Sequence, residues 1–462
     1  MGVGFNQILR GSIATLVMAL ALCMPPATSA ASEPEFRDDL TPFFDLFSPD
    51  TGTIDRAFRS IDDRWHDGYV PMLLEVQRFT RNPDVAVRLV ELLQKKTGQE
   101  FGFDVNGWYQ WLWNREEQRL PYYAMFKSVL YGHIDPKFAG YFSEGRPARI
   151  RLDEIVWGGV VQDGIPPLRS PEMIAPDEAR YLADDNVLFV LAINGYARAY
   201  PKRILAWHEM FVDVVGGVPV TGAYCTLCGS MILYKSQADG AVHRLGTSGF
   251  LYRSNKLMYD EGTQSLWNTL WGSPVLGPLV DQNIQLERLS VVTTTWGEWR
   301  RRHPDTSVLS LNTGHERDYS EGEAYRQYFA TDELMFSVPV LDRRLSNKDE
   351  VLGVIFPQYP DKPLAIAADY LSEHPVFHDR VGERRFVVLT DASGANRVYE
   401  ARDVTFIRWD GQQSVIDANG DTWHLTESAL TAPNGRLLYR LPAHRAFWFG
   451  WYSAYSHSRL IR

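Results

Sequence analysis

Cysteine is rare in this sequence, with three among 462 residues. So few cysteines exclude a small fold held together by many disulfides, and the length is typical of about two to four domains. Basic residues are also fewer than acidic ones, 47 against 57, which gives a net charge of −10. Proteins that bind nucleic acid need a basic face to neutralise phosphates, so nucleic acid is not an expected partner.

Apolar runs of membrane-spanning length are missing from the chain after its first residues. Near the start, Arg10 is followed by an apolar stretch over residues 13–24 and then by small residues up to Ala30. This pattern predicts a secretory signal peptide over residues 1–30, with an uncleaved anchor as the alternative. Cleavage would also remove Cys23 and leave two cysteines. We therefore expect an exported protein, periplasmic or secreted, with no membrane span after signal removal.

Helical periodicity characterises residues 31–145, where apolar residues recur at helix spacing, as in Met72, Leu73 and Val76. Asn82 and Pro83 separate two such runs, as the end of one helix and the start of the next would. The pattern predicts a small domain of paired helices.

From residue 146 onward, short β-branched and aromatic runs separated by glycine predict strands. The pattern His-x-x-Phe-x-Asp-x-Val-Gly occurs twice, at residues 208–216 and 374–382. We interpret residues 146–345 and 346–462 as two copies of one β-rich unit, the second shortened and degenerate. The predicted fold class is therefore α+β, with a small helical domain followed by a β-rich body of two related units.

The duplication separates shared residues from those found in one copy. His208 has a counterpart in His374, and Asp213 has one in Asp379, so these positions are candidates for structural roles. Cys225 and Cys228 occur in the first copy alone. These two cysteines are therefore candidates for chemistry.

Cys225 and Cys228 form a Cys-x-x-Cys motif. In an exported chain, this spacing serves a redox dithiol, part of a metal site or a local structural disulfide. Closing so short a loop stabilises a protein by only roughly 2 kcal/mol, so a purely structural disulfide is the weakest of the three readings.

Soft-metal binding is the first hypothesis, because two thiolates with an imidazole or thioether suit copper or zinc. The predicted ligands are Cys225, Cys228 and His208, although the repeat weighs against the histidine, since its counterpart lies in a copy without cysteines. Other possible third donors are Met231, Met258 and His315.

A thiol–disulfide oxidoreductase is the alternative, with Cys225 and Cys228 as the catalytic residues. This chemistry requires a stabilised thiolate, which a nearby cation or a helix N-terminus supplies. Residues 231–234 resemble a strand, so we expect the pair on a turn at a strand junction.

A second polar stretch follows the cysteines and contains side chains suited to hydrogen bonding. We expect them to surround a pocket or to form a turn network. They are Ser248, Tyr252, Asn255 and Asp260.

These motifs together resemble a known family. Tyr-Cys-x-Leu-Cys-Gly-Ser at residues 224–230 is preceded by Trp-His-Glu at 207–209 and followed by the polar motif that ends at Asp260. Over about residues 145–345, the chain resembles the bacterial and archaeal exported family catalogued as domain of unknown function 3179. Val212 departs from the family pattern, which has Asn there. The resemblance implies export and an important Cys-x-x-Cys, but no reaction.

A third hypothesis is a non-enzymatic binding or scaffold protein. Its helical domain and β-rich copies would contact a partner, either a small molecule or a protein, that the sequence does not identify.

Overall fold

The computed structural model describes residues 37–462 except residue 144. The chain divides into two compact units, and each is considered by itself. The helical unit runs to Gly159 and includes Phe336–Pro339, whereas the β-rich unit comprises Val160–Met335 and Val340–Arg462. The predicted signal peptide lies outside the described residues. Within those residues, no helix combines the length and apolar character that crossing a membrane requires.

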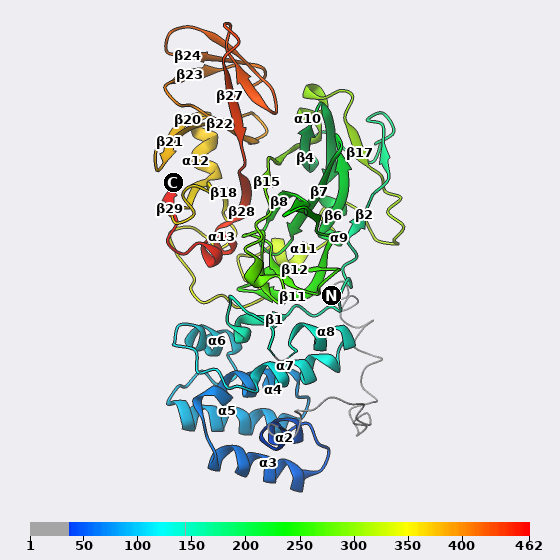
Figure 1. Ribbon diagram of the computed structural model, residues 1–462, viewed down its shortest axis with the longest axis vertical. Coiled ribbons are helices and arrows are strands. Elements are labelled where there is room, and N and C mark those ends of the chain that lie inside the picture. The colour runs from blue at the N-terminus through cyan, green and yellow to red at the C-terminus, as the bar shows by residue number, and fades with distance from the viewer. Residues whose placement is uncertain (1–36, 144) are drawn as a thin grey trace. The chain divides into compact units, whose positions relative to one another are not determined.

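The helical unit is built from short helices whose ends the sequence caps (Figure 1). Asn82 accepts hydrogen bonds from two backbone N–H groups at the start of one helix, and Pro83 occupies its first position. The predicted helix boundary at these residues is therefore confirmed. The elements are α2 (Arg37–Asp45), α3 (Thr51–Asp63), η1 (Asp67–Tyr69), α4 (Val70–Phe79), α5 (Pro83–Thr97), α6 (Val105–Trp113), α7 (Tyr123–Gly132), α8 (Pro136–Tyr141), η2 (Leu152–Glu154) and the short strand β1 (Ile155–Trp157).

A buried ion pair lies in the core of the helical unit. Lys127 Nζ is 3.0 Å from Glu75 Oε1, and the two side chains are 0% and 1% exposed. Lys127 also donates to the Ile155 carbonyl at 2.7 Å, and the Tyr131 hydroxyl donates to Glu75 Oε1 at 2.7 Å. Buried charges need such partners, because removing them from water is costly.

The helical unit is discontinuous in sequence. The Ser337 hydroxyl lies 2.5 Å from Asn106 Oδ1, and the Asn114 side chain donates to the Pro339 carbonyl at 2.7 Å. The segment Phe336–Pro339, far along the chain, therefore bonds to one side chain of α6 and to the side chain that directly follows this helix.

The first half of the β-rich unit contains three main sheets. One has the order β16-β4-β5-β17-β3, the second β15-β8-β7-β6-β2, and a third includes β11, β12, β13 and β14 in that order. The elements are β2 (Leu168–Arg169), β3 (Met173–Ile174), β4 (Val187–Ile193), β5 (Tyr196–Pro201), α9 (Lys202–His208), β6 (Met210–Val215), β7 (Val218–Cys225), β8 (Ser230–Lys235), β9 (Gln237–Ala238), β10 (Ala241–Val242), β11 (Leu245–Tyr252), β12 (Asn255–Asp260), β13 (Leu266–Asn268), β14 (Ser273–Leu276), η3 (Val280–Gln282), β15 (Arg288–Leu289), β16 (Val292–Thr295), α10 (Trp296–Arg302), β17 (Ser307–Leu309) and α11 (Arg326–Phe329).

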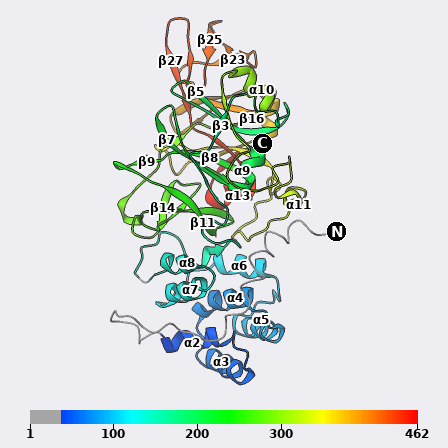
Figure 2. The ribbon, with the colours of Figure 1, turned by 90° about the vertical axis from the view of Figure 1, so that its right-hand side faces the viewer.

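The second half contains a four-stranded sheet, β28-β18-β19-β29, and an eight-stranded one, β20-β21-β22-β27-β26-β25-β24-β23. Strands β23, β25 and β27 lie together at one end of the β-rich unit (Figures 1 and 2). The elements are β18 (Glu350–Val354), β19 (Leu364–Ala367), α12 (Ala368–Glu373), β20 (Val376–Val381), β21 (Arg384–Thr390), β22 (Asn396–Glu400), β23 (Phe406–Trp409), β24 (Ser414–Asp417), β25 (Thr422–Leu425), β26 (Ala429–Thr431), β27 (Leu437–Leu441), β28 (His444–Phe447), α13 (Trp448–Ala454) and β29 (Arg459–Ile461).

Corresponding elements occur in the two halves in the same order. Strands β5 and β17 pair in parallel in the sheet β16-β4-β5-β17-β3, and strands β19 and β29 do so in the sheet β28-β18-β19-β29. Helices α10 and α13 then begin with Trp-x-x-Trp. In each, the second indole donates to a hydroxyl seven residues later, Trp299 to Thr306 and Trp451 to Ser458, both at 2.9 Å. The structure thus confirms helices followed by a β-rich body with several sheets.

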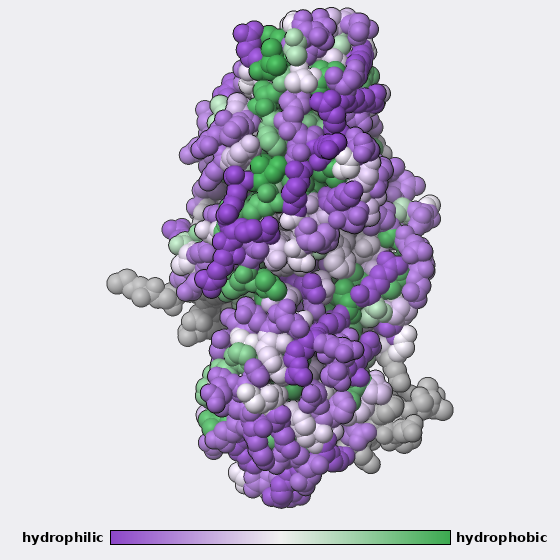
Figure 3. All heavy atoms as spheres, turned by 90° about the vertical axis from the view of Figure 1, so that its left-hand side faces the viewer, coloured by the Kyte–Doolittle hydropathy of each residue, from purple (hydrophilic) through white to green (hydrophobic). Residues whose placement is uncertain are grey.

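The eight-stranded sheet exposes part of its apolar surface. Ile407 and Leu437 are both exposed to solvent. Figure 3 shows hydrophobic residues in green gathered along one face at the end of the β-rich unit where this sheet lies. Most of the apolar residues of the sheet instead face a buried core that includes Val387, Tyr399 and Trp423.

Candidate functional site

The two cysteines flank a tight turn between antiparallel strands. Cys225 ends β7 and is paired across the sheet with Ser230, the first residue of β8. Gly229 adopts a left-handed conformation with φ of 57°, which glycine accepts most readily. A side chain at this position would also approach the ring of Phe447 to 2.9 Å. The pair therefore lies on a turn at a strand junction, as predicted.

Cys225 and Cys228 are joined in a disulfide with their Cα atoms 5.3 Å apart. Both residues are buried, with exposed fractions of 2% and 0%. The sulfur of Cys228 lies 3.3 Å from the Ser254 carbonyl oxygen. In the reduced protein, a thiol on Cys228 would donate to that oxygen.

Several side-chain oxygen atoms beside the disulfide have no hydrogen-bond partner. They are Thr226 Oγ1, Ser230 Oγ and Asn255 Oδ1, and all three residues are buried. Directly paired residues in an antiparallel sheet project their side chains from the same face, so the Ser230 hydroxyl lies beside Cys225. Each unsatisfied buried group costs about 1–3 kcal/mol. The oxidised site therefore carries the energetic cost of several buried polar atoms without hydrogen bonds.

The hairpin that presents Ser254 to Cys228 has an unusual backbone. Strands β11 and β12 are joined by Arg253 and Ser254, whose φ angles are 49° and 64°. Two consecutive positive φ angles are typical of a type I′ turn, where Asn-Gly is the usual sequence. Neither Arg nor Ser favours this conformation, and such strain is concentrated at functional sites.

Lys256 places a buried cation behind the turn. Its ammonium donates to the carbonyls of Glu209 at 2.8 Å and Tyr224 at 3.0 Å, and it lies 3.5 Å from Glu209 Oε2. Burial lowers the pKa of Lys256 to about 8. Our sequence reasoning missed this residue. The only local signal was the apolar run Leu257-Met258-Tyr259 directly after Lys256, and a lysine beside such a run is rarely buried unless it is paired.

His208 is buried, and both of its ring nitrogens form hydrogen bonds. Its Nδ1 donates to the Pro166 carbonyl at 2.8 Å, and its Nε2 accepts from the Tyr319 hydroxyl at 2.6 Å. The carbonyl can only accept, which assigns the neutral tautomer. Burial lowers the pKa of His208 to about 4. Both ring nitrogens are therefore engaged, and neither offers a lone pair to a metal.

The predicted metal ligands do not come together. Among the described residues, no group of three or more His, Cys, Asp and Glu side chains could hold a metal ion. Met231 follows Ser230 in β8 and so projects from the opposite face of the sheet, whereas Met258 packs in a hydrophobic core. His315 is exposed.

The four predicted pocket residues divide between two places. Asn255 lies at the cysteine turn, where its amide donates to the Gly450 carbonyl at 3.3 Å. The Ser248 hydroxyl donates to the Leu257 carbonyl at 2.6 Å, and Asp260 accepts from the Thr263 N–H at 2.8 Å. Tyr252 packs against Trp271, with ring centroids 5.8 Å apart. These last three residues serve turn and strand structure.

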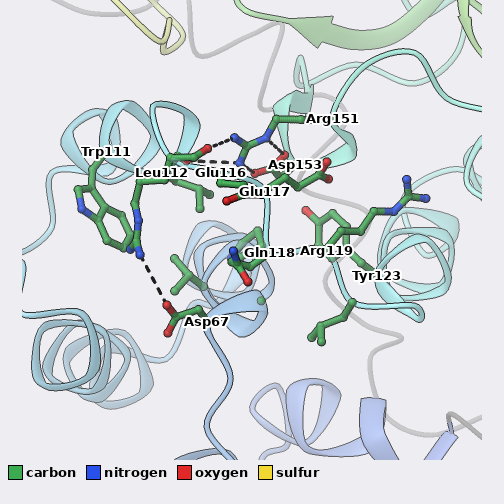
Figure 4. Close-up of a pocket in the computed structure, with 15 residues that line it drawn as sticks. Asp67, Trp111, Leu112, Glu116, Glu117, Gln118, Arg119, Tyr123, Arg151 and Asp153 are labelled. Carbon is green, nitrogen blue, oxygen red and sulfur yellow. Dashed lines mark hydrogen bonds and ion pairs between the residues drawn. The ribbon is translucent and has the colours of Figure 1, made fainter.

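The helical unit contains a small cavity lined by charged side chains (Figure 4). Arg151 points toward Asp153 and bonds it at 2.6 Å, and Arg115 lies 3.6 Å from Asp67. The cavity has a volume of about 20 Å³, room for roughly one water. Two of its arginines are held in these ion pairs, and a cavity of this size has no room for a substrate.

Comparison with known proteins gives one match. A family model described as "Protein of unknown function (DUF3179)" matches residues 162–458. The matched region thus extends through both halves of the β-rich unit, beyond the residues that carry the motifs. No curated protein and no solved structure matches the chain.

Proposed function

The chain belongs to the family described as Protein of unknown function (DUF3179), and because that description names no reaction, we propose a function from the site itself. The proposal is a thiol–disulfide oxidoreductase in which Cys225 and Cys228 exchange an electron pair with an external thiol. Its main support is the buried disulfide beside hydrogen-bonding groups that have no partner.

The unpaired hydroxyl of Ser230 favours the reduced pair, with the negatively charged sulfur on Cys225. A disulfide sulfur is a weak acceptor, whereas a thiolate accepts strong hydrogen bonds. The Lys256 ammonium, bonded to the carbonyl of the preceding Tyr224, adds a positive charge nearby. Cys228 faces the Ser254 carbonyl oxygen, which favours a protonated thiol. Cys225 is therefore the attacking thiolate and Cys228 the resolving thiol.

The exchange balances with two equivalents of an external thiol. A thiolate attacks Cys225 Sγ, the Cys225–Cys228 bond breaks, and its electron pair leaves on Cys228 Sγ, which takes a proton. A second thiolate then attacks the external sulfur of the mixed disulfide and releases Cys225 as a thiolate. The products are the reduced pair and one external disulfide.

The direct test is the reduction potential of the pair in the folded protein. Equilibration in dithiothreitol buffers should give a two-electron transition above about −300 mV, the limit typical of structural disulfides. Cys225→Ser and Cys228→Ser should each abolish it. A pair that is reduced only when the protein unfolds would contradict the proposal.

Ser230→Ala tests the assignment of the attacking sulfur. Loss of a hydrogen bond to a charged sulfur should slow alkylation of Cys225 by iodoacetamide in the reduced protein about tenfold at neutral pH, or about 1.4 kcal/mol. Ser236→Ala is the matched control, because that buried hydroxyl pairs with Thr221 at 2.8 Å. Equal alkylation rates in all three proteins would remove Ser230 from the site.

Soft-metal binding by the reduced pair is the alternative proposal, since two thiolates are soft ligands for copper or zinc. Stoichiometric zinc on the reduced protein that is lost in Cys225→Ser would favour it. If both cysteine variants leave fold and phenotype intact, a binding or scaffold role is favoured instead.

We also infer an exported location and a duplicated β-rich body. Disulfides persist in oxidising compartments, which supports a periplasmic or secreted protein and fits the predicted signal peptide over residues 1–30. The matching sheet orders and the paired Trp hydrogen bonds support residues 146–345 and 346–462 as related copies.

A further inference from the structure

The second half of the β-rich unit covers the disulfide through α13 and the residue before it. The Phe447 N–H donates to the Cys228 carbonyl at 2.7 Å. Asn255 donates to the Gly450 carbonyl at 3.3 Å, and Arg253 donates to the Ser453 carbonyl at 3.4 Å. The chain segment 447–453 is therefore bonded both to the cysteine turn and to the hairpin beside it.

The packing between α13 and the turn leaves no space. A Cβ atom on Gly450 would lie 2.9 Å from the Cβ of Cys228, a distance that real side chains do not tolerate. The Phe447 ring occupies the space in front of Gly229, so that a Cβ there would also meet it at 2.9 Å. Glycines on both sides of the contact thus permit the approach of the two backbones.

The corresponding helix of the first half is built differently. Aligned on their Trp-x-x-Trp motifs, α10 carries Glu298 where α13 carries Gly450. Glu298 forms an ion pair with Arg302 at 2.7 Å. A side chain of that size at position 450 would collide with Cys228. The two helices therefore differ at the position that faces the cysteines.

We propose that α13 is a movable cover of the redox site, and that thiol exchange at Cys225–Cys228 requires its displacement. This inference rests on the proposed redox function. An attacking thiolate must approach a sulfur in line with the S–S bond. Both cysteines are almost fully buried, and Phe447 and Gly450 contact Cys228 directly, so an external thiol needs part of this covering to move. In this proposal, the role of the second half of the β-rich unit, which lacks cysteines, is to supply this cover.

The cover predicts a distinctive rate law. When opening precedes reaction, the rate of disulfide reduction rises with dithiothreitol concentration and then reaches a plateau equal to the opening rate. Removing the Phe447 ring weakens the closed state, so Phe447→Ala should raise the plateau about tenfold or more. Gly450→Ala should act in the same direction, because its added Cβ displaces α13 from Cys228.

The matched control is Phe386→Ala in β21, a buried phenylalanine whose ring lies 6.0 Å from that of Phe356 in another core. It destabilises the β-rich unit without touching the cysteine turn, and its plateau should remain near that of the unaltered protein. Phe447→Leu is the milder variant to use if Phe447→Ala does not fold.

The outcomes separate the two proposals. A reduction rate that is unchanged by Phe447→Ala and Gly450→Ala, or equal acceleration by Phe386→Ala, overturns the cover and leaves the redox function standing. A disulfide that is reduced only as the whole protein unfolds overturns both. A plateau raised by changes at Phe447 and Gly450, but not at Phe386, supports the cover.

Discussion

Replacing Lys127 with methionine is expected to destabilise the helical unit by about 3–5 kcal/mol, the cost of breaking a buried ion pair. The change leaves the Glu75 carboxylate buried with the Tyr131 hydroxyl but without the ammonium that pairs with it. Burial itself lowers the pKa of Lys127, while Glu75 opposes that effect. Chemical denaturation followed by helical circular dichroism measures the loss.

A double substitution tests the reason for this loss. Because the penalty comes from the unpaired carboxylate, adding Glu75→Leu should recover much of the stability. Lys95→Met is the control, since Lys95 pairs with Asp62 at the surface, at 2.9 Å, and should cost less than about 1 kcal/mol. Equal stability of the single and double variants would contradict the argument.

Acidification from pH 6.5 to pH 4 is expected to lower the free energy of unfolding of the β-rich unit by several kcal/mol. Burial lowers the pKa of His208 to about 4 and that of His444 to about 3. The unfolded chain therefore binds more protons than the folded one in this pH range, so stability falls as pH falls. For His208, the gap from 6.5 to about 4 corresponds to about 3 kcal/mol.

The test compares denaturant unfolding at several pH values. His208→Gln removes one titrating group, so the decline in stability between pH 6.5 and pH 4 should become shallower. His374→Gln provides the control, because His374 is exposed and should leave the pH dependence unchanged. The same slope in His208→Gln as in the unaltered protein would exclude His208 as a source of acid sensitivity.

Local features of the fold followed from local sequence. Asn82 and Pro83 marked a helix start, and the residues after Cys228 indicated a strand, because capping and strand preference depend on neighbours in the chain. Side chains alternate between the two faces of a strand, so Met231 is expected on the face opposite Ser230. Because Ser230 pairs with Cys225, Met231 is thereby separated from Cys225.

The residues that surround the cysteines could not be predicted from local sequence patterns. Lys256 meets Glu209 across 47 residues of sequence, and Asn255 meets Gly450 across 195. Such contacts depend on how separate sheets pack, which no local pattern encodes. His208 was one of four possible third donors in the metal hypothesis, and its two ring nitrogens bond Pro166 and Tyr319, the latter in a loop 111 residues away.

Two pairs of residues match between the two halves of the β-rich unit, one of aspartates and one of histidines. The aspartates have similar surroundings, whereas the histidines do not. Asp213 and Asp379 each accept a hydrogen bond from the next backbone N–H at 2.7 Å, and each pairs with an arginine. This agrees with a structural role for both. His208 is buried, whereas His374 is exposed and stacks on Tyr370. A shared residue type therefore does not imply a shared environment.

The discontinuity of the helical unit has a consequence for biosynthesis. Ser337 contacts Asn106 across 231 residues of sequence, so this part of the unit stays incomplete until most of the chain has been made. Contacts so distant in sequence slow folding, because a long intervening loop must first be closed. A fragment ending at Gly159 would lack residues 336–339 and, with them, the partners that the Asn106 and Asn114 side chains find in Ser337 and Pro339. These contacts of α6 and Asn114 therefore form only after most of the first half of the β-rich body has been synthesised.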